Sequence, residues 1–183
     1  AYRNKFQYGK AINNYRKALG KFNRYNYEYL SGRLLIPLAR CFCDMGLGDR
    51  ASEYLEKATV ICSKFNEPLI MGRIKNYEAN VYFLKQNYEK TINRLEVALE
   101  IFQDGELRKP TAELLIELMV THIVFDKPEK QEKLEKLRNK YERLSKKLTD
   151  SGLDDSSIKC IDYYMQVYGM SNIELDLKTV DDS

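Results

Sequence analysis

Three stretches of the chain carry small and bulky residues at helical spacing, and they superpose without gaps. They are residues 8–19 (YGKAINNYRKAL), 48–59 (GDRASEYLEKAT) and 88–99 (YEKTINRLEVAL), at steps of 40 residues. A spacing of three and four predicts amphipathic helices, and a fixed period of this length is typical of stacked repeats. The shared positions hold Ala11, Ala51 and Thr91, then Tyr15, Leu55 and Leu95, then Ala18, Ala58 and Ala98.

The segments ahead of these stretches follow the same period. Residues 35–46 align with residues 75–86, which places Ala39 over Ala79 and Phe42 over Tyr82. The unit is therefore a helix, a short turn and a second helix. Small residues allow two helices to approach closely, and bulky residues fill the space beside them. The sequence predicts an all-α fold, with Ala18, Ala58 and Ala98 at equivalent buried positions.

The pattern divides the chain into one helical domain and a tail. Pro37 predicts a kink or a late start of its helix, and Asn66 is the expected N-cap ahead of Pro68. The first helix lacks a partner, so we expect the chain to be a fragment of a longer protein. The predicted parts of the domain 1–170 are a half-repeat 5–23, repeats 27–66, 68–105 and 110–149, and a terminal helix 153–170, followed by an extended or disordered tail 171–183.

The helix predicted at 128–149 departs from the repeat pattern. Its apolar residues follow a 3–4–3–4 spacing: Leu134, Leu137, Tyr141, Leu144 and Leu148. Such a stripe fits a terminal capping helix with one narrow buried face. It also fits a coiled-coil seam for a partner. The sequence leaves both interpretations open.

Composition and charge exclude few classes of protein but favour an intracellular protein. The formal net charge of +3 does not by itself require nucleic acid, and no apolar run approaches the roughly 20 residues of a membrane span. Cys41 and Cys43 would point about 200° apart on a helix and cannot share a metal. Cys41, Cys43, Cys62 and Cys160 form no C-x-x-C pair, so we expect reduced cysteines acting as small apolar residues in the cytoplasm.

The sequence offers little catalytic chemistry. The single histidine, His122, aligns with Phe42 and Tyr82 and is expected to pack between helices. No H-E-x-x-H pair, glycine-rich phosphate loop or nucleophile elbow is found. We therefore expect no enzyme activity, no cofactor and no metal.

The repeating residues resemble the tetratricopeptide repeat over about residues 5–105. The positions that fit its pattern are Ala79, Tyr82, Tyr88, Thr91, Leu95 and Ala98, with threonine in place of the first alanine of the second helix. The spacing of 40 residues exceeds the usual length of about 34. Long repeats of this kind are similar to those of Gram-positive peptide-sensing regulators and response-regulator phosphatases, and of several eukaryotic scaffolds. The resemblance implies an α-solenoid of antiparallel helix pairs in a right-handed superhelix.

In such a stack the first helix of each pair lines the concave face. Register places Arg33, Ile36, Arg40 and Cys43 there, then Arg73, Asn76, Asn80 and Phe83, then Glu113, Ile116, Val120 and Ile123. An asparagine amide can pair with both polar groups of a peptide backbone, and arginine can hold a carboxylate through two bonds. The predicted binding residues are Arg33, Arg40, Arg73, Asn76, Asn80 and Phe83, and the expected ligand is an extended peptide or acidic tail.

The expected function is therefore protein or peptide binding without catalysis. The resemblance favours the sensor or regulatory part of a peptide-responsive transcriptional regulator or phosphatase regulator. The alternative is a scaffold domain that docks a partner protein in a larger complex. A homodimer is possible, whereas contact with a membrane and direct nucleic-acid binding are not expected.

Overall fold

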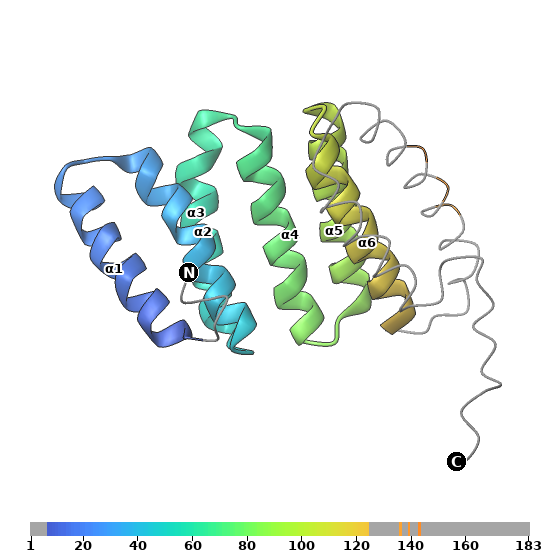
Figure 1. Cartoon of the computed structure of the whole chain (residues 1–183), viewed down its shortest axis with the longest axis horizontal. Coiled ribbons are helices and arrows are strands. Elements are labelled where there is room, and N and C mark those ends of the chain that lie inside the picture. Colours follow the sequence, from blue (N-terminus) through green and yellow to red (C-terminus); the bar gives the residue numbers. More distant parts are fainter. Residues whose placement is uncertain (1–6, 125–135, 137–138, 140–142, 144–183) are drawn as a thin grey trace, which may run out of the picture. The chain divides into compact units, whose positions relative to one another are not determined.

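The computed structural model describes residues 7–124 together with residues 136, 139 and 143. The elements are α1 (Tyr8–Arg24), α2 (Glu28–Asp44), α3 (Gly48–Cys62), a 3-10 helix η2 (Ser63–Phe65), α4 (Pro68–Leu84), α5 (Tyr88–Asp104) and α6 (Arg108–Val124) (Figure 1). These described residues include no strand, which confirms the all-α prediction. The chain divides into two compact units, residues 1–114 and 115–183, and each is described by itself.

The helices begin at intervals of 20 residues, which is half of the period found in the sequence. Their first residues are Tyr8, Glu28, Gly48, Pro68, Tyr88 and Arg108. Two residues ahead of each helix from α2 onward stands a residue with positive φ: Asn26 (57°), Gly46 (73°), Asn66 (47°), Gln86 (55°) and Glu106 (54°). A left-handed residue at this place turns the chain and lets the next amides reach the last helical carbonyls.

Four of the five turns also share one backbone hydrogen bond. The N–H of the residue after the left-handed one donates to the carbonyl five positions earlier. The pairs are Tyr27 to Phe22 at 2.9 Å, Leu47 to Phe42 at 2.9 Å, Asn87 to Tyr82 at 3.0 Å and Leu107 to Phe102 at 2.8 Å. The backbone conformation of the turn therefore repeats, although the residue at the left-handed position differs from turn to turn and is a glycine only at Gly46.

One expectation about the turns is wrong, and one of the two alternatives at Pro37 is excluded. Asn66 does not cap α4: Glu67 is the N-cap and Pro68 the first helical residue. Asn66 instead takes the left-handed position, which a short polar side chain tolerates better than most. In α2 the helix runs unbroken from Glu28 to Asp44 with Pro37 inside it, so the proline does not delay its start.

Within the first unit, α2 packs on α3 and α4 packs on α5. α1 packs on α2, and α3 on α4. The first helices of the two pairs, α2 and α4, also contact each other. Ala58 and Ala98 are fully buried as expected. Ala18 is only half-buried, so the three alanines are not equivalent.

Two buried glycines set the close approach inside the pairs. A Cβ on Gly32 would lie 2.6 Å from Cγ2 of Ile61 and 2.8 Å from Sγ of Cys62. A Cβ on Gly72 would lie 2.2 Å from Cε1 of Phe102. Both glycines face the second helix of their pair. The glycines are 40 residues apart, and so are the neighbouring positions 62 and 102, which hold a cysteine and a phenylalanine. This glycine column was not recognised in the sequence, although it obeys the same period.

α4 is packed on two opposite sides. Ile70, Ile74 and Val81 are buried on one side, and Gly72 and Ala79 on the other. At 3.6 residues per turn the two sets lie roughly opposite each other around the axis. Two strips of α4 therefore remain open, and both carry polar side chains.

Candidate binding surfaces

The first open strip of α4 lies beside a matching strip of α2. On α4 it comprises Arg73, Tyr77, Asn80 and Leu84, and on α2 the residues 40 positions earlier, Arg33, Pro37, Arg40 and Asp44. Each of these side chains is exposed or half-buried. α2 and α4 contact each other, and Arg40 of one strip donates to Tyr77 of the other, so the strips adjoin within the first unit. We call this the first-helix surface.

Arginine side chains on this surface lie against tyrosine rings. Arg40 donates from Nη1 to the hydroxyl of Tyr77 at 2.9 Å, and its guanidinium carbon lies 5.5 Å from the ring centroid. Arg33 donates to the hydroxyl of Tyr29 at 3.4 Å and lies 5.3 Å from that ring. A cation over an aromatic face is stabilised by about 0.5–1 kcal/mol at an exposed site. The Arg40–Tyr77 contact also joins α2 to α4.

Four of the six predicted binding residues reach the first-helix surface: Arg33, Arg40, Arg73 and Asn80. Asn76 and Phe83 are half-buried and fall toward the side of α4 that carries Gly72. The Oδ1 atom of Asn76 is shielded from solvent. Tyr77, which sequence analysis did not select, takes the central place on α4.

The expectation that Ile36 and Cys43 point into the groove is wrong. Both are core residues, with exposed fractions of 4% and 8%. They lie on the helix face of Gly32, which packs against α3, so the open strip passes through Pro37 instead. Burial raises the pKa of the Cys43 thiol from its ordinary value near 9 to about 11.

The other predicted groove positions lie on α6. Glu113 is exposed, Ile116 and Val120 are half-buried, and the side chain of Ile123 lies outside the described residues. His122 is buried, with 2% of its surface exposed. The proposed seam from Leu134 to Leu148 and the tail 171–183 also lie outside the described residues.

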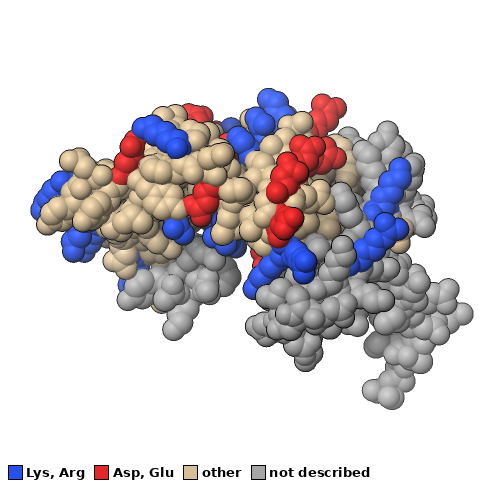
Figure 2. Space-filling model, turned by 90° about the horizontal axis from the view of Figure 1, so that it is seen from above, with Lys and Arg blue, Asp and Glu red and all other residues tan. Residues whose placement is uncertain are grey.

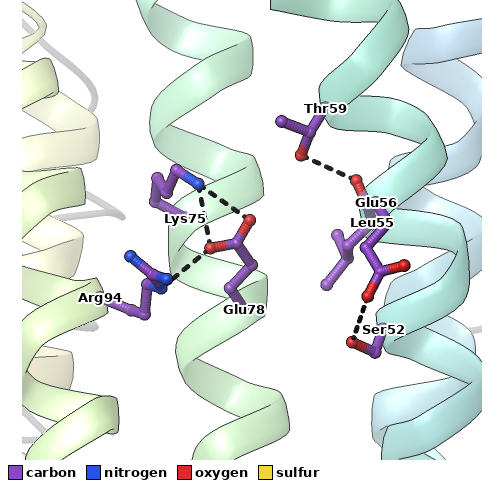
Figure 3. Close-up of polar contacts among 7 residues, drawn as sticks. All are labelled: Ser52, Leu55, Glu56, Thr59, Lys75, Glu78 and Arg94. Carbon is purple, nitrogen blue, oxygen red and sulfur yellow. Dashed lines mark hydrogen bonds and ion pairs between the residues drawn. The ribbon is translucent and has the colours of Figure 1, made fainter.

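A second site, the polar cleft, lies over the other open strip of α4, between α3 and α5 (Figure 3). Its volume is about 250 Å³. The lining residues are Ser52, Leu55 and Glu56 of α3, Lys75, Glu78, Val81, Tyr82 and Lys85 of α4, and Arg94 of α5. Lys75, Glu78, Tyr82 and Lys85 follow a 3–4–3 spacing, a signal that could have been read from the sequence.

Glu78 is the centre of the polar cleft. Its two carboxylate oxygens accept from Nζ of Lys75 at 2.9 and 3.0 Å. Oε2 also lies 3.1 Å from Nε of Arg94. The exposed fractions are 20% for the side chains of Lys75 and Glu78 and 36% for Arg94. The carboxylate of one helix is thus shared by two cations, one from its own helix and one from α5.

The other charged groups of the polar cleft are Lys85 on α4 and Glu56 on α3. Lys85 pairs with Asp49 at 2.7 Å. This hydrogen bond raises the pKa of Lys85 and lowers that of Asp49. On the α3 wall, the carboxylate of Glu56 accepts a long hydrogen bond, 3.5 Å, from the hydroxyl of Ser52. Glu56 is exposed, so water screens its charge more than that of Glu78.

A third feature is an aromatic end surface at the α1–α2 and α3–α4 turns. Tyr25, Tyr27 and Phe65 have exposed fractions of 65%, 54% and 43%. The Tyr29 ring lies 4.8 Å from that of Phe65, and its hydroxyl donates to Glu67, which raises the pKa of Tyr29. Figure 2 views the molecule from this end and shows broad uncharged surface between the charged groups.

The described residues contain no group of three or more His, Cys, Asp or Glu side chains placed to hold a metal ion. No helix in the described part of the chain is long and apolar enough to cross a membrane.

Comparison of the sequence with models of known protein families finds no match, and neither does comparison with curated proteins. The tetratricopeptide likeness therefore rests on the residue pattern alone.

Proposed function

We propose that this chain is a protein- or peptide-binding domain without catalytic activity, built as a tetratricopeptide-like α-solenoid. The arrangement of α2 to α5 supports this. The first helices α2 and α4 contact each other, whereas the polar cleft opens between the second helices α3 and α5. Helix pairs stacked with their first helices closer together curve toward those helices, which makes the first-helix surface the concave one.

The contact between α2 and α4 is the observation that carries the proposal. Arg40 of one pair donates to Tyr77 of the next. Arg33 lies on the same strip of α2 as Arg40, and Arg73 and Asn80 lie on the same strip of α4 as Tyr77. Arginines supply paired donors for a carboxylate, and the Asn80 amide supplies a donor and an acceptor for a peptide backbone. The ligand is an extended peptide with an acidic side chain or a free carboxyl end.

Following the resemblance, the biological role is that of the sensor or regulatory part of a cytoplasmic, peptide-responsive regulator. The aromatic end surface favours a second role, as a scaffold domain. Exposed tyrosine and phenylalanine side chains are enriched where proteins bind one another. Tyr25 contacts Tyr27 in one turn and Phe65 contacts Tyr29 beside another, and the two turns lie at the same end of the first unit (Figure 1).

The proposal is tested by selecting ligands from a displayed library of linear peptides with free carboxyl ends. Selected peptides are then titrated by fluorescence anisotropy against the parent protein and an Arg73→Ala, Asn80→Ala double variant. We expect at least about tenfold weaker binding by the double variant, or about 1.4 kcal/mol. Arg50→Ala is the matched control, because Arg50 is an exposed arginine on the second helix α3. Equal binding by the parent and the double variant refutes the first-helix surface as the site.

A further inference from the structure

We propose that the polar cleft is a second binding site, specific for a carboxylate group. It does not depend on the first-helix surface. The cleft residues Lys75, Glu78, Tyr82 and Lys85 lie about 150° around the α4 axis from the strip that runs from Arg73 to Leu84. The chain thus has two places at which a partner can bind the same helix.

One charged cluster inside the cleft, Lys75, Glu78 and Arg94, favours an anion. Glu78 is the only carboxylate paired with both Lys75 and Arg94 among the described residues, so this cluster carries one positive charge in excess. All three side chains are half-buried, with exposed fractions of 20%, 20% and 36%. Water and salt screen such a charge less than one on the open surface. Lys85 adds little, because Asp49 already pairs with it.

Arg94 has the geometry for binding the anion. Figure 3 shows its guanidinium beside the carboxylate of Glu78. The printed contact is made by Nε, which leaves it to the two terminal amino groups to meet a ligand. These two groups form the planar fork that pairs with both oxygens of a carboxylate. The hydroxyls of Ser52 and Tyr82 also line the cleft and can serve as further donors.

The size and charge of the cleft favour a carboxylate over a phosphate. A volume of about 250 Å³ accommodates a group of side-chain size. The excess of one positive charge belongs to the Lys75–Glu78–Arg94 cluster and matches a single negative charge. The exposed Glu56 on the α3 wall offsets this excess across the whole cleft and disfavours a doubly charged group. The carboxylate can belong to a glutamate or aspartate of a partner protein or to a small free acid.

The probe is a terminally blocked Gly-Glu-Gly peptide, with Gly-Gln-Gly, acetate and inorganic phosphate as comparisons. Binding is followed by NMR at the Nε–H signal of Arg94. We expect a saturable shift with the glutamate peptide and none with the glutamine peptide. If acetate binds as tightly as the glutamate peptide, a small free acid is sufficient as the ligand. If acetate binds more weakly, the ligand is a carboxylate side chain of a protein. Both outcomes support the proposal.

Variants with opposite expected effects separate a built site from general charge attraction. Lys75→Gln should weaken binding of the glutamate peptide about tenfold, or about 1.4 kcal/mol, whereas Glu56→Gln should tighten it. The Arg73→Ala, Asn80→Ala variant should leave it unchanged, which distinguishes this site from the first-helix surface. Since Glu56 is exposed and makes only one long hydrogen bond, its variant should fold even if Lys75→Gln does not.

The proposal is overturned if the cleft binds an adventitious ion only. Such binding would appear as equal, non-saturating shifts with acetate, phosphate and the glutamate peptide. Shifts that persist unchanged in Lys75→Gln, or affinity that does not rise in Glu56→Gln, lead to the same conclusion.

Discussion

The ring of Phe102 occupies the space that a side chain at position 72 would need. A Cβ on Gly72 would lie 2.2 Å from Cε1 and 2.6 Å from Cδ1 of that ring. Phe102 is itself 2% exposed, so it has little room to move. We therefore expect Gly72→Ala to lower the free energy of unfolding by about 1–3 kcal/mol, measured by urea denaturation.

Gly20→Ala is the control for this prediction. Gly20 also lies inside a helix, but a Cβ there meets nothing within 4 Å. Replacing it should raise the free energy of unfolding by about 0.5–1 kcal/mol, because alanine is the better helix former. Equal effects of the two substitutions would show that helix propensity, rather than the contact with Phe102, decides the outcome at position 72.

The repeat predicts that enlarging Ala58 is costly, and the structure predicts that enlarging Ala18 is not. Ala58 has no exposed surface, so Ala58→Leu should overpack the core and lower the free energy of unfolding by about 1–3 kcal/mol. Ala18 is half-buried, and Ala18→Leu should change it by less than about 0.5 kcal/mol. Thermal melts of both variants test this difference, and an Ala58→Leu variant as stable as the parent contradicts it.

Substitutions at two left-handed turn residues should change the stability of the protein in opposite directions. Gly46→Ala should destabilise the protein by about 1–2 kcal/mol, because φ is 73° at this position. Gln86 has a φ of 55° at the equivalent place, so Gln86→Gly should remove strain and raise stability. The measurement is chemical denaturation of each variant. Stability that falls in Gln86→Gly would mean that the side chain contributes more than the strain costs.

Burial of Cys43 predicts a loss of stability at alkaline pH. Its thiol has a pKa of about 11 in the folded protein and near 9 when unfolded. Between these values the unfolded chain binds fewer protons than the folded one, so stability falls as pH rises from about 9 toward 11. The loss attributable to this group is at most about 2.7 kcal/mol.

This effect is isolated by comparing the parent with Cys43→Ala, because tyrosines and lysines titrate in the same range. The free energy of unfolding should fall more steeply in the parent than in Cys43→Ala between about pH 9 and about pH 11, the interval spanned by the two pKa values. Identical slopes in the two proteins would assign the alkaline loss to other groups.

The shared carboxylate of Glu78 predicts non-additive substitutions. Glu78→Gln leaves Lys75 and Arg94 half-buried without their anion and should cost roughly 1–2 kcal/mol. Adding Arg94→Gln to it should cost less than the sum of the two single changes, because both act on one network. A double-mutant cycle in urea measures this coupling, and strictly additive effects would show that the Glu78–Arg94 pair contributes nothing to stability.

The sequence alone determined the helices and their pairing. The 40-residue alignment of Ala51 with Thr91 and of Leu55 with Leu95 predicted segments whose bounds agree with α3 and α5 to within a few residues. Helical spacing is encoded by residues three and four apart, so it can be read without knowing what lies opposite. The burial of Ala58 and Ala98 followed for the same reason.

Only the tertiary structure decided which side of each first helix is open. α4 carries apolar residues on two opposite sides, Ile74 on one and Ala79 on the other, so no single apolar stripe reveals its orientation. The orientation of α4 is determined at Gly72, where the ring of Phe102 packs against the helix backbone. This contact turns Asn76 toward the packed side and leaves Tyr77 and Asn80 open, as the equivalent contact of Gly32 turns Ile36 and Cys43 inward. The polar cleft likewise depends on the separation of α3 and α5 where both pack on α4. Side chains that are far apart in the sequence determine this separation together.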